Sequence, residues 1–332
     1  MQRRDLIHTV LHGSLSLVLS ERLIRKKRMQ RTDEVPVGII GLDTSHAPAF
    51  TRIFNNPQFE ANFRVTHAYP HGSLDIESST SRIPRYTEEM REMNVEVVDS
   101  IDELLGQVEK ALLLTNDGRR HLEQARQVFA AGKTMFIDKP LAASLSDVRT
   151  ILREADQHQV PVFSASSLRF APSTQAIANG SIGKVIAADI YSPATLEKTH
   201  PDLFWYGIHG VESLFTVMGR GCRQVRRIHH DDMEIVVGEW ADGRIGTFRG
   251  LRSGKTDYGG VAFGEDGIAP AGRYEGYEHL VREIARFFEN GESPVDPEET
   301  VEIFAFMEAA HESKRRGGDP VLLSEVMALH DK

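Results

Sequence analysis

Residues 134–140 read TMFIDKP, and this stretch decides the fold class of the chain. The apolar run 134–137 is typical of a short buried strand, and it stops at Asp138, Lys139 and Pro140 before a helical pattern begins. In open α/β sheets, ligands bind at the carboxyl ends of the strands. The pattern therefore predicts a lysine ammonium at a ligand-binding edge, although an isolated lysine before a proline also fits a solvated turn.

Strand-like runs alternate with helical patterns along residues 35–164, which indicates a parallel sheet with crossover helices. Strands are expected at 35–40, 64–69, 95–98, 111–114, 134–137 and 160–163. The spacing of apolar residues predicts helices at 123–131 and 145–158, each with one face on the sheet. We expect a doubly wound α/β domain over 35–164.

The alternation of strand and helix patterns ends after Ser164. Strand-like runs follow one another with turn signals such as Asp242-Gly243 between them, at 185–191, 224–228, 233–240, 245–251 and 259–263. This succession is typical of an antiparallel sheet, and helices are expected at 208–218, 277–288 and 297–315. We therefore expect a second domain over 165–332, with one sheet face free for a partner or a second subunit.

Composition limits the classes of function. The chain has 332 residues, of which 40% are hydrophobic and 26% charged, so it can form two domains with proper cores. A net charge of −9 argues against a nucleic-acid surface. The single cysteine, Cys222, excludes an intramolecular disulfide and a cysteine-based zinc site. No stretch approaches the length of a transmembrane helix, and no metal site is expected.

Residues 1–34 differ from the rest, because eight basic and four acidic residues give them a net charge of +4. Arg3 and Arg4 resemble the start of a twin-arginine export signal. However, polar residues interrupt the apolar region, no small-x-small cleavage pattern follows, and a basic block occupies 25–28. We prefer a dispensable extension with Met29 as the true start, and hence a cytoplasmic protein, over export.

Several short motifs occur in an order that resembles a known family. They are a glycine turn at Gly41, Thr115-Asn116 with His121, the stretch ending in Asp138-Lys139-Pro140, Leu168-Arg169-Phe170, and Gly207-Ile208-His209. Over 35–326 their order and spacing resemble the glucose-fructose oxidoreductase / inositol dehydrogenase / MocA (Gfo/Idh/MocA) family. The resemblance implies an α/β fold in which a Rossmann dinucleotide-binding domain precedes an α+β domain with an open, mostly antiparallel sheet. It also implies an NAD(P)-dependent oxidoreductase of sugars or polyols.

The resemblance implies roles for individual residues. Lys139 matches the lysine of the family's Glu-Lys-Pro motif, which contacts nicotinamide and substrate, and Asp138 replaces the glutamate. His209 matches the general acid/base, a role that suits an imidazole because its pKa lies near working pH. The implied cofactor-binding residues are Gly41, Thr44, Ser45, His46, Thr115, Asn116, His121, Asp138, Lys139, Pro140 and Arg169. The implied substrate-binding residues are Lys139, Trp205, Tyr206 and His209.

Two departures from the family pattern concern the cofactor. Asp43 and His46 stand where the fingerprint has a glycine and a small residue, and a carboxylate is unfavourable beside a pyrophosphate unless Asp43 turns away to cap the following helix. After the second strand, Pro70 stands where a carboxylate usually binds the adenosine ribose. Arg82 or Arg85 could reach a 2′-phosphate there, or be surface residues, so the cofactor is NAD or NADP.

A third departure lies near the catalytic end. Trp205 stands four residues before His209, where the family commonly has an aspartate. Proton relay or substrate anchoring would then come from elsewhere, with Asp202, Tyr206, Glu212 and His200 as candidates. Trp205 itself could stack on a sugar ring or pack in the core. The loop 197–202 is expected to contribute to substrate specificity.

Three functions remain open. The preferred one is a dehydrogenase or reductase that transfers a hydride between NAD(P) and a CH–OH group of a carbohydrate-like substrate. The second is an enzyme that retains its cofactor and oxidises a glycoside transiently to allow elimination. The third is a binding homologue that has lost redox activity, which Asp43, Pro70 and Trp205 all favour. A homodimer or homotetramer is expected through the second sheet.

Overall fold

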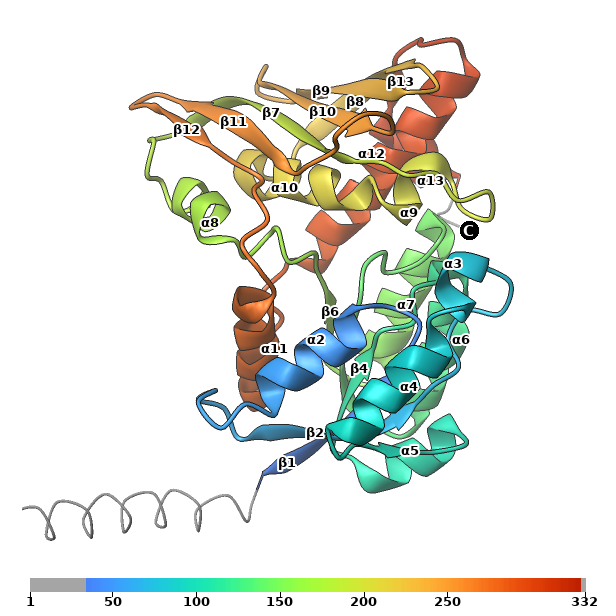
Figure 1. Cartoon of the computed structure of the whole chain (residues 1–332). Helices are drawn as coiled ribbons and strands as arrows, with labels where there is room; N and C mark the ends of the chain where they lie inside the picture. The colour runs from blue at the N-terminus through green and yellow to red at the C-terminus, as the bar shows by residue number, and fades with distance from the viewer. Residues whose placement is uncertain (1–33, 330–332) are drawn as a thin grey trace, which may run out of the picture.

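The computed structural model describes residues 34–329, so the predictions for the N-terminal extension lie outside the described residues, Glu34 excepted. Two sheets with their helices lie one above the other (Figure 1). The first sheet has the strand order β3-β2-β1-β4-β5-β6, and all its pairs are parallel. Its strands are β1 (Val35–Ile40), β2 (Phe63–Tyr69), β3 (Glu96–Val97), β4 (Lys110–Leu113), β5 (Thr134–Ile137) and β6 (Val162–Ser164).

The strand order reverses between β1 and β4, and this reversal positions the site. Chain connections leave β1 and β4 in opposite directions across the sheet, which opens a crevice at their carboxyl ends. All six strands lie within two residues of where the sequence predicts them. The doubly wound fold is therefore confirmed for this part of the chain.

Helices cover both faces of the first sheet. They are α2 (His46–Phe54), α3 (Glu77–Thr80), α4 (Ile83–Glu92), α5 (Ile101–Gln107), α6 (Gly118–Ala130) and α7 (Leu145–Gln157). In β4, Ala111 and Leu113 join the core under α5 and α6, whereas Leu112 packs in the core under α2. A strand buried on both faces needs no polar alternation, which explains its continuous apolar run.

One face of the first sheet is completed by a helix from far along the chain. Helix α11 (Glu278–Asn290) lies beside α2, and Leu280, Ile284 and Phe287 pack in the same core as Phe136 of β5. The first sheet is thus covered partly by a helix that follows every strand of the second sheet except β13 in sequence (Figure 1).

The second sheet is mixed. Its order is β12-β11-β7-β10-β9-β8-β13, built from β7 (Val185–Pro193), β8 (Cys222–His229), β9 (Met233–Trp240), β10 (Ile245–Leu251), β11 (Gly259–Gly264), β12 (Ile268–Pro270) and β13 (Val321–Leu322). All pairs are antiparallel except β7 with β10, so the expectation of an open, mostly antiparallel sheet is confirmed. No hairpin joins β7 to β10, so no tight turn dictates their relative direction.

Helices cover one face of the second sheet. They are α8 (Pro172–Ala178), α9 (Asp202–Trp205), α10 (Ile208–Met218), α12 (Pro297–Arg315) and α13 (Leu323–Ala328), and α10 and α12 lie directly against the strands. A Cβ on Gly210 of α10 would lie 2.3 Å from the Phe248 ring, so glycine permits the close approach. In the described part of the chain no helix covers the other face (Figure 1). None of the helices described is long and apolar enough to cross a bilayer.

Candidate active site

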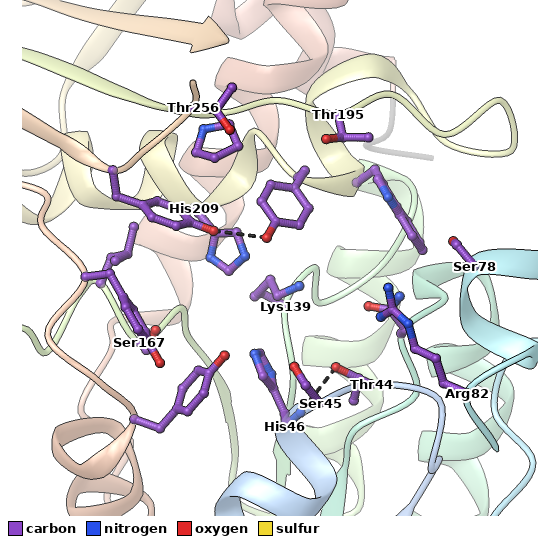
Figure 2. A pocket seen from close by; sticks show the side chains of 18 of the residues that line it. Thr44, Ser45, His46, Ser78, Arg82, Lys139, Ser167, Thr195, His209 and Thr256 are labelled. Atoms are coloured by element: carbon purple, nitrogen blue, oxygen red, sulfur yellow. Dashed lines mark hydrogen bonds between the residues drawn. The ribbon is translucent and has the colours of Figure 1, made fainter. Parts of the chain in front are cut away.

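A cavity of about 700 Å³ opens between the carboxyl ends of the first sheet and the helix-covered side of the second (Figure 2). The first sheet and its loops contribute Thr44, Ser45, His46, Ser78, Arg82, Tyr86, Asn116 and Lys139. The opposite wall consists of Ser167, Leu168, Pro193, Thr195, Trp205, Tyr206, His209, Thr256, Tyr258, Tyr274 and Tyr277. The fold therefore brings eight of the predicted site residues to one cavity: Thr44, Ser45, His46, Asn116, Lys139, Trp205, Tyr206 and His209.

The turn after β1 has the geometry of an anion-binding loop. Gly41 has φ +94°, and a Cβ there would lie 2.6 Å from the Thr115 backbone, so only glycine fits. Helix α2 begins directly afterwards, with no acidic residue in its first turn and no side-chain cap at Ser45. Its N-terminus can therefore bind a phosphate group.

Asp43 does not face the cavity. Its carboxylate accepts hydrogen bonds from the backbone N–H and hydroxyl of Ser73 and from the backbone N–H of Asn116. Burial raises the pKa of Asp43, although these donors oppose the shift. Asp43 turns away from the cavity without capping α2, because its carboxylate ties together the loops after β1, β2 and β4. The electrostatic objection to a bound pyrophosphate is thereby removed.

Asp138 and Lys139 lie at the end of β5. One Asp138 oxygen accepts the Lys139 N–H at 2.9 Å, and the other lies 2.6 Å from Nδ1 of His46. Burial acts to raise the pKa of Asp138, but His46 and Lys139 hold it below the usual aspartate value. Asp138 is thus an ionised group behind the cavity wall, while the Lys139 ammonium lies 5.9 Å from the centre of the Tyr206 ring.

His209 is the second residue of α10, and its ring is buried at the cavity wall. Its Nδ1 lies 2.7 Å from the Ser166 hydroxyl, and the rings of Tyr206 and Tyr258 contact it edge-on. Burial, together with Lys139 and His46, lowers the pKa of His209 well below 6.5. His209 is therefore neutral at neutral pH and able to accept a proton.

Arg169 is not brought to the cavity. Its Nε donates to Glu212 at 2.7 Å and its Nη2 to Glu299 at 2.6 Å, and all three groups lie behind the wall. The other Glu212 oxygen accepts the Ser166 N–H at 2.8 Å. Arg169 and Glu212 thus hold the residue that contacts His209, a supporting position rather than the cofactor contact expected from the sequence.

Other predicted residues also lie behind the lining. The His121 ring is buried between the carbonyl groups of Thr115, at 2.6 Å, and Leu141, at 3.1 Å. Gly41, Thr115, Asp138 and Pro140 likewise shape the loops without lining the cavity. Asn116 does line it, and its side chain donates to Ser79 at 2.9 Å.

The residues considered for proton relay lie in different places. Asp202 is bound by Arg227 and Lys314, and it does not line the cavity. His200 lies 3.4 Å from Asp117, and burial lowers the pKa of His200 to about 4. Tyr206 reaches the cavity and accepts a hydrogen bond from the Tyr258 hydroxyl at 3.0 Å.

Trp205 combines the two interpretations made from the sequence. Trp205 is 8% exposed and its ring lies 4.9 Å from the His200 ring, yet it also lines the cavity. Trp205 is therefore a packed side chain with one edge available to a ligand.

Sequence reasoning missed Ser166 and the aromatic side chains Tyr258, Tyr274 and Tyr277. The tyrosine rings form a continuous series, with centroids 6.3 Å apart from Tyr258 to Tyr274 and 5.4 Å from Tyr274 to Tyr277. The serine-rich stretch 164–167 at the end of β6 could have indicated Ser166, because it stands at a strand end like Lys139.

Arg82 and Arg85 occupy different environments. Arg82 points into the cavity near Ser78 (Figure 2), whereas Arg85 pairs with Glu89 on the surface of α4. Within residues 34–329 no group of three or more His, Cys, Asp or Glu side chains is arranged to hold a metal ion.

Comparisons with known proteins agree with this architecture. Residues 35–166 match the model of the Gfo/Idh/MocA family, described as an oxidoreductase family with an NAD-binding Rossmann fold. Over these residues the chain is similar to the Gfo/Idh/MocA oxidoreductase family, and its doubly wound sheet is the α/β fold of a dinucleotide-binding domain. A stretch of 99 residues is 33% identical to 1,5-anhydro-D-fructose reductase of Ensifer adhaerens. That match covers 28% of this chain and 30% of the relative.

Solved structures show the same fold over most of the chain. The structure of GenD2 from gentamicin A biosynthesis in complex with NAD has a TM-score of 0.72 at 19% identity, covering 88% of this chain and 97% of GenD2. Scyllo-inositol dehydrogenase from Lactobacillus casei, with bound NAD(H) and scyllo-inositol, has a TM-score of 0.70 at 15% identity. It matches 87% of this chain and 99% of its own.

The residues present fit a dinucleotide. The glycine at Gly41, the uncapped N-terminus of α2 and the inward-facing Thr44 and Ser45 together suit a diphosphate. The strand-order reversal places these groups beside Lys139.

Proposed function

We propose that the protein transfers a hydride between NAD or NADP and a CH–OH group of a sugar, polyol or related carbohydrate. The observation that carries this proposal is the meeting of Lys139 and His209 in one cavity beside the turn at Gly41. Lys139 follows β5 of the first sheet, whereas His209 lies on α10 under the second sheet, and both side chains face the same space (Figure 2). A dinucleotide bound at α2 would supply or accept the hydride.

The cavity residues would handle the proton and orient the substrate. In the oxidation direction, neutral His209 takes the proton from the reacting hydroxyl, because its low pKa leaves a free ring nitrogen at neutral pH. The Lys139 ammonium binds the oxygen on which negative charge develops. Tyr206 and Trp205 provide faces and edges for a polyhydroxylated ring. In the reduction direction the same groups act in reverse.

The open face of the second sheet supports a homo-oligomer. Ile228, Met233 and Ile245 are all exposed on strands of that sheet. A sheet face that no described helix covers, with exposed apolar side chains on it, supports a protein interface. We propose that residues 165–332 serve both substrate binding and oligomerisation, and that residues 35–164 bind the dinucleotide.

A cytoplasmic location is also proposed. It is supported by the departures of residues 1–34 from an export signal, above all the basic block at 25–28. Immunodetection after cell fractionation tests it.

The decisive experiment is a titration of the purified protein with NADH and NADPH, followed by nicotinamide fluorescence, together with mass spectrometry of any copurified nucleotide. Micromolar affinity for either supports the proposal. A tightly retained nucleotide with turnover but no net change in NAD(P)H would instead favour transient oxidation with elimination. Absence of binding up to millimolar concentration would favour a homologue without redox activity.

Substitutions then assign the roles. His209→Ala should remove most turnover and leave cofactor affinity nearly unchanged, whereas Lys139→Ala should reduce both. Lys133→Ala is a matched control, because Lys133 precedes the same strand but pairs with Glu109 outside the cavity. Unchanged turnover in His209→Ala would contradict the catalytic assignment.

A further inference from the structure

Two residues that depart from the family pattern contact each other. His46 stands where the glycine fingerprint has a small residue, and Asp138 stands where the lysine motif has glutamate. They are 92 positions apart, yet Nδ1 of His46 lies 2.6 Å from a carboxylate oxygen of Asp138. A glutamate at 138 would extend the side chain by one carbon, about 1.5 Å, into the space of the imidazole. The two departures are therefore sterically matched.

The contact fixes the orientation of the imidazole. Asp138 is ionised and can only accept, so the proton of His46 lies on Nδ1. The ring stacks on Phe50 at 5.3 Å with an interplanar angle of 8°, and Tyr277 contacts it edge-on at 4.9 Å. Carboxylate and aromatic neighbours together hold the ring in one position.

The other ring nitrogen remains available to a ligand. His46 lines the cavity, and its ring points into it below Lys139 (Figure 2). No hydrogen bond from Nε2 to another described residue is formed. An imidazole whose Nδ1 donates to Asp138 presents Nε2 to the cavity in a fixed direction.

The position of the ring indicates which ligand atoms it meets. His46 begins α2, beside the diphosphate-binding turn, but its side chain reaches across to Asp138 at the end of β5. Lys139 follows on that strand and faces the same part of the cavity. The imidazole therefore lies on the reactive side of a dinucleotide rather than at the turn itself.

We propose that His46 binds the nicotinamide half of the dinucleotide through Nε2, and that Asp138 acts as its positioning residue. The inference rests on the proposed function, because it requires a dinucleotide at α2. It adds a side-chain contact at a position where the family pattern offers only a small residue, and it explains why aspartate replaces glutamate before Lys139.

Two substitutions at one position separate ligand contact from packing. In His46→Asn the side-chain amide occupies the region of Nδ1, so it can still donate to Asp138 but has nothing at Nε2. In His46→Gln the amide reaches the region of Nε2 and leaves Asp138 without its partner. We measure affinities for NADH and for ADP-ribose, which lacks nicotinamide, by calorimetry, and thermal unfolding in parallel.

The proposal expects His46→Asn to weaken NADH binding roughly tenfold, the loss of about one hydrogen bond, with ADP-ribose affinity within about twofold of wild type. His46→Gln should bind NADH more tightly than His46→Asn while melting at a lower temperature. Wild-type NADH affinity in His46→Asn would overturn the proposal. Equal weakening of NADH and ADP-ribose would also overturn it, because the contact would then be at the diphosphate.

A measurement on the unaltered protein covers the case in which a variant does not fold. In protein labelled with ¹⁵N-histidine, the Nε2 resonance of His46 should shift on addition of NADH and stay in place with ADP-ribose. An unchanged resonance with NADH bound would refute the contact. If wild type binds neither NADH, NADPH nor ADP-ribose, the proposed function and this inference fail together, whereas binding without any His46 effect removes the inference alone.

Discussion

The Nδ1 atom of His209 lies 2.7 Å from the hydroxyl oxygen of Ser166. His209 belongs to α10 under the second sheet, and Ser166 lies two residues beyond β6 of the first sheet. The orientation of the proposed acid/base thus depends on a residue that the first sheet positions. Glu212 reinforces this link, because it accepts the Ser166 N–H from one turn further along α10.

Ser166→Ala should therefore lower kcat roughly tenfold and leave the NADH affinity unchanged, since a lost hydrogen bond loosens the imidazole without touching the cofactor. Steady-state kinetics and a fluorescence titration check both values. Ser213→Ala is the control, because the Ser213 hydroxyl donates to the backbone carbonyl of His209 and not to its ring. Equal losses in the two variants would refute a specific role for Ser166.

The pH dependence follows from the low pKa of His209. Burial and the nearby Lys139 and His46 lower that pKa well below 6.5, so protonation of His209 should not limit kcat/KM at pH 6.5. The unfolded chain takes up this proton near pH 6.5 and the folded chain does not, so this histidine makes stability fall as pH drops through that value.

NMR titration of His209 measures the pKa directly. Lys139→Met removes one of the causes of the shift, so the His209 pKa should rise in that variant. A titration of His209 at or above pH 6.5 in the wild-type protein would contradict the prediction.

Asp43 should contribute to stability because its buried carboxylate accepts three hydrogen bonds. Asp43→Ala leaves the donors of Ser73 and Asn116 unpaired and should cost about 2–4 kcal/mol of the free energy of unfolding. Asp43→Asn retains one acceptor and should cost less. Urea denaturation provides the measurement, and Asp242→Ala, at an exposed turn, should leave the midpoint unchanged. An unchanged midpoint in Asp43→Ala would show that the hydrogen bonds from Ser73 and Asn116 to Asp43 are not required for stability.

Arg82 should influence the choice between NAD and NADP. Its guanidinium faces the cavity, where it can pair with the 2′-phosphate, while Arg85 pairs with Glu89 on the surface. Arg82→Ala should weaken NADPH binding roughly tenfold more than NADH binding, the effect of one charge-assisted hydrogen bond. Arg85→Ala should change neither affinity. Parallel losses for both cofactors in Arg82→Ala would assign the residue to a group that they share.

The open sheet face predicts an oligomer that charge can disrupt. Ile228 is 70% exposed and Ile245 is 50% exposed, on strands β8 and β10. Aspartate at both positions would bury charge in an interface, so the double variant should have a smaller mass in sedimentation equilibrium. Leu74→Asp, an equally exposed leucine in a loop after β2, should not change the mass. A wild-type protein that sediments as a monomer would contradict the predicted oligomer.

Strand periodicity and motif order predicted most of the fold, because buried parallel strands leave continuous apolar runs. The runs at 35–40 and 134–137 became β1 and β5 with the same limits. The strands β12 and β13 were missed, since three and two residues are too short for any period. The parallel pairing of β7 with β10 was missed because sequence neighbours do not reveal which distant strands lie side by side.

The site was predictable where its residues follow strand ends, as Lys139 and Asn116 do. Residues in loops were harder, because nothing in their spacing shows which way a side chain points. Arg169 matched a family position and yet turned to Glu212, and Asp43 turned to Ser73 instead of to α2. The contact of His46 with Asp138 joins two segments whose separate departures look unrelated in the sequence.

The core of the first sheet cannot close during synthesis until helix α11 has been made. This helix is made after nearly the whole of the second sheet, yet Leu280, Ile284 and Phe287 close the core against Phe136. While the polypeptide is being synthesised, the part of that face which α11 covers stays exposed until about 290 residues have left the ribosome, and exposed apolar surface promotes aggregation. A product truncated before α11 would therefore be a target for chaperones and proteases, even though every strand of its first sheet is present.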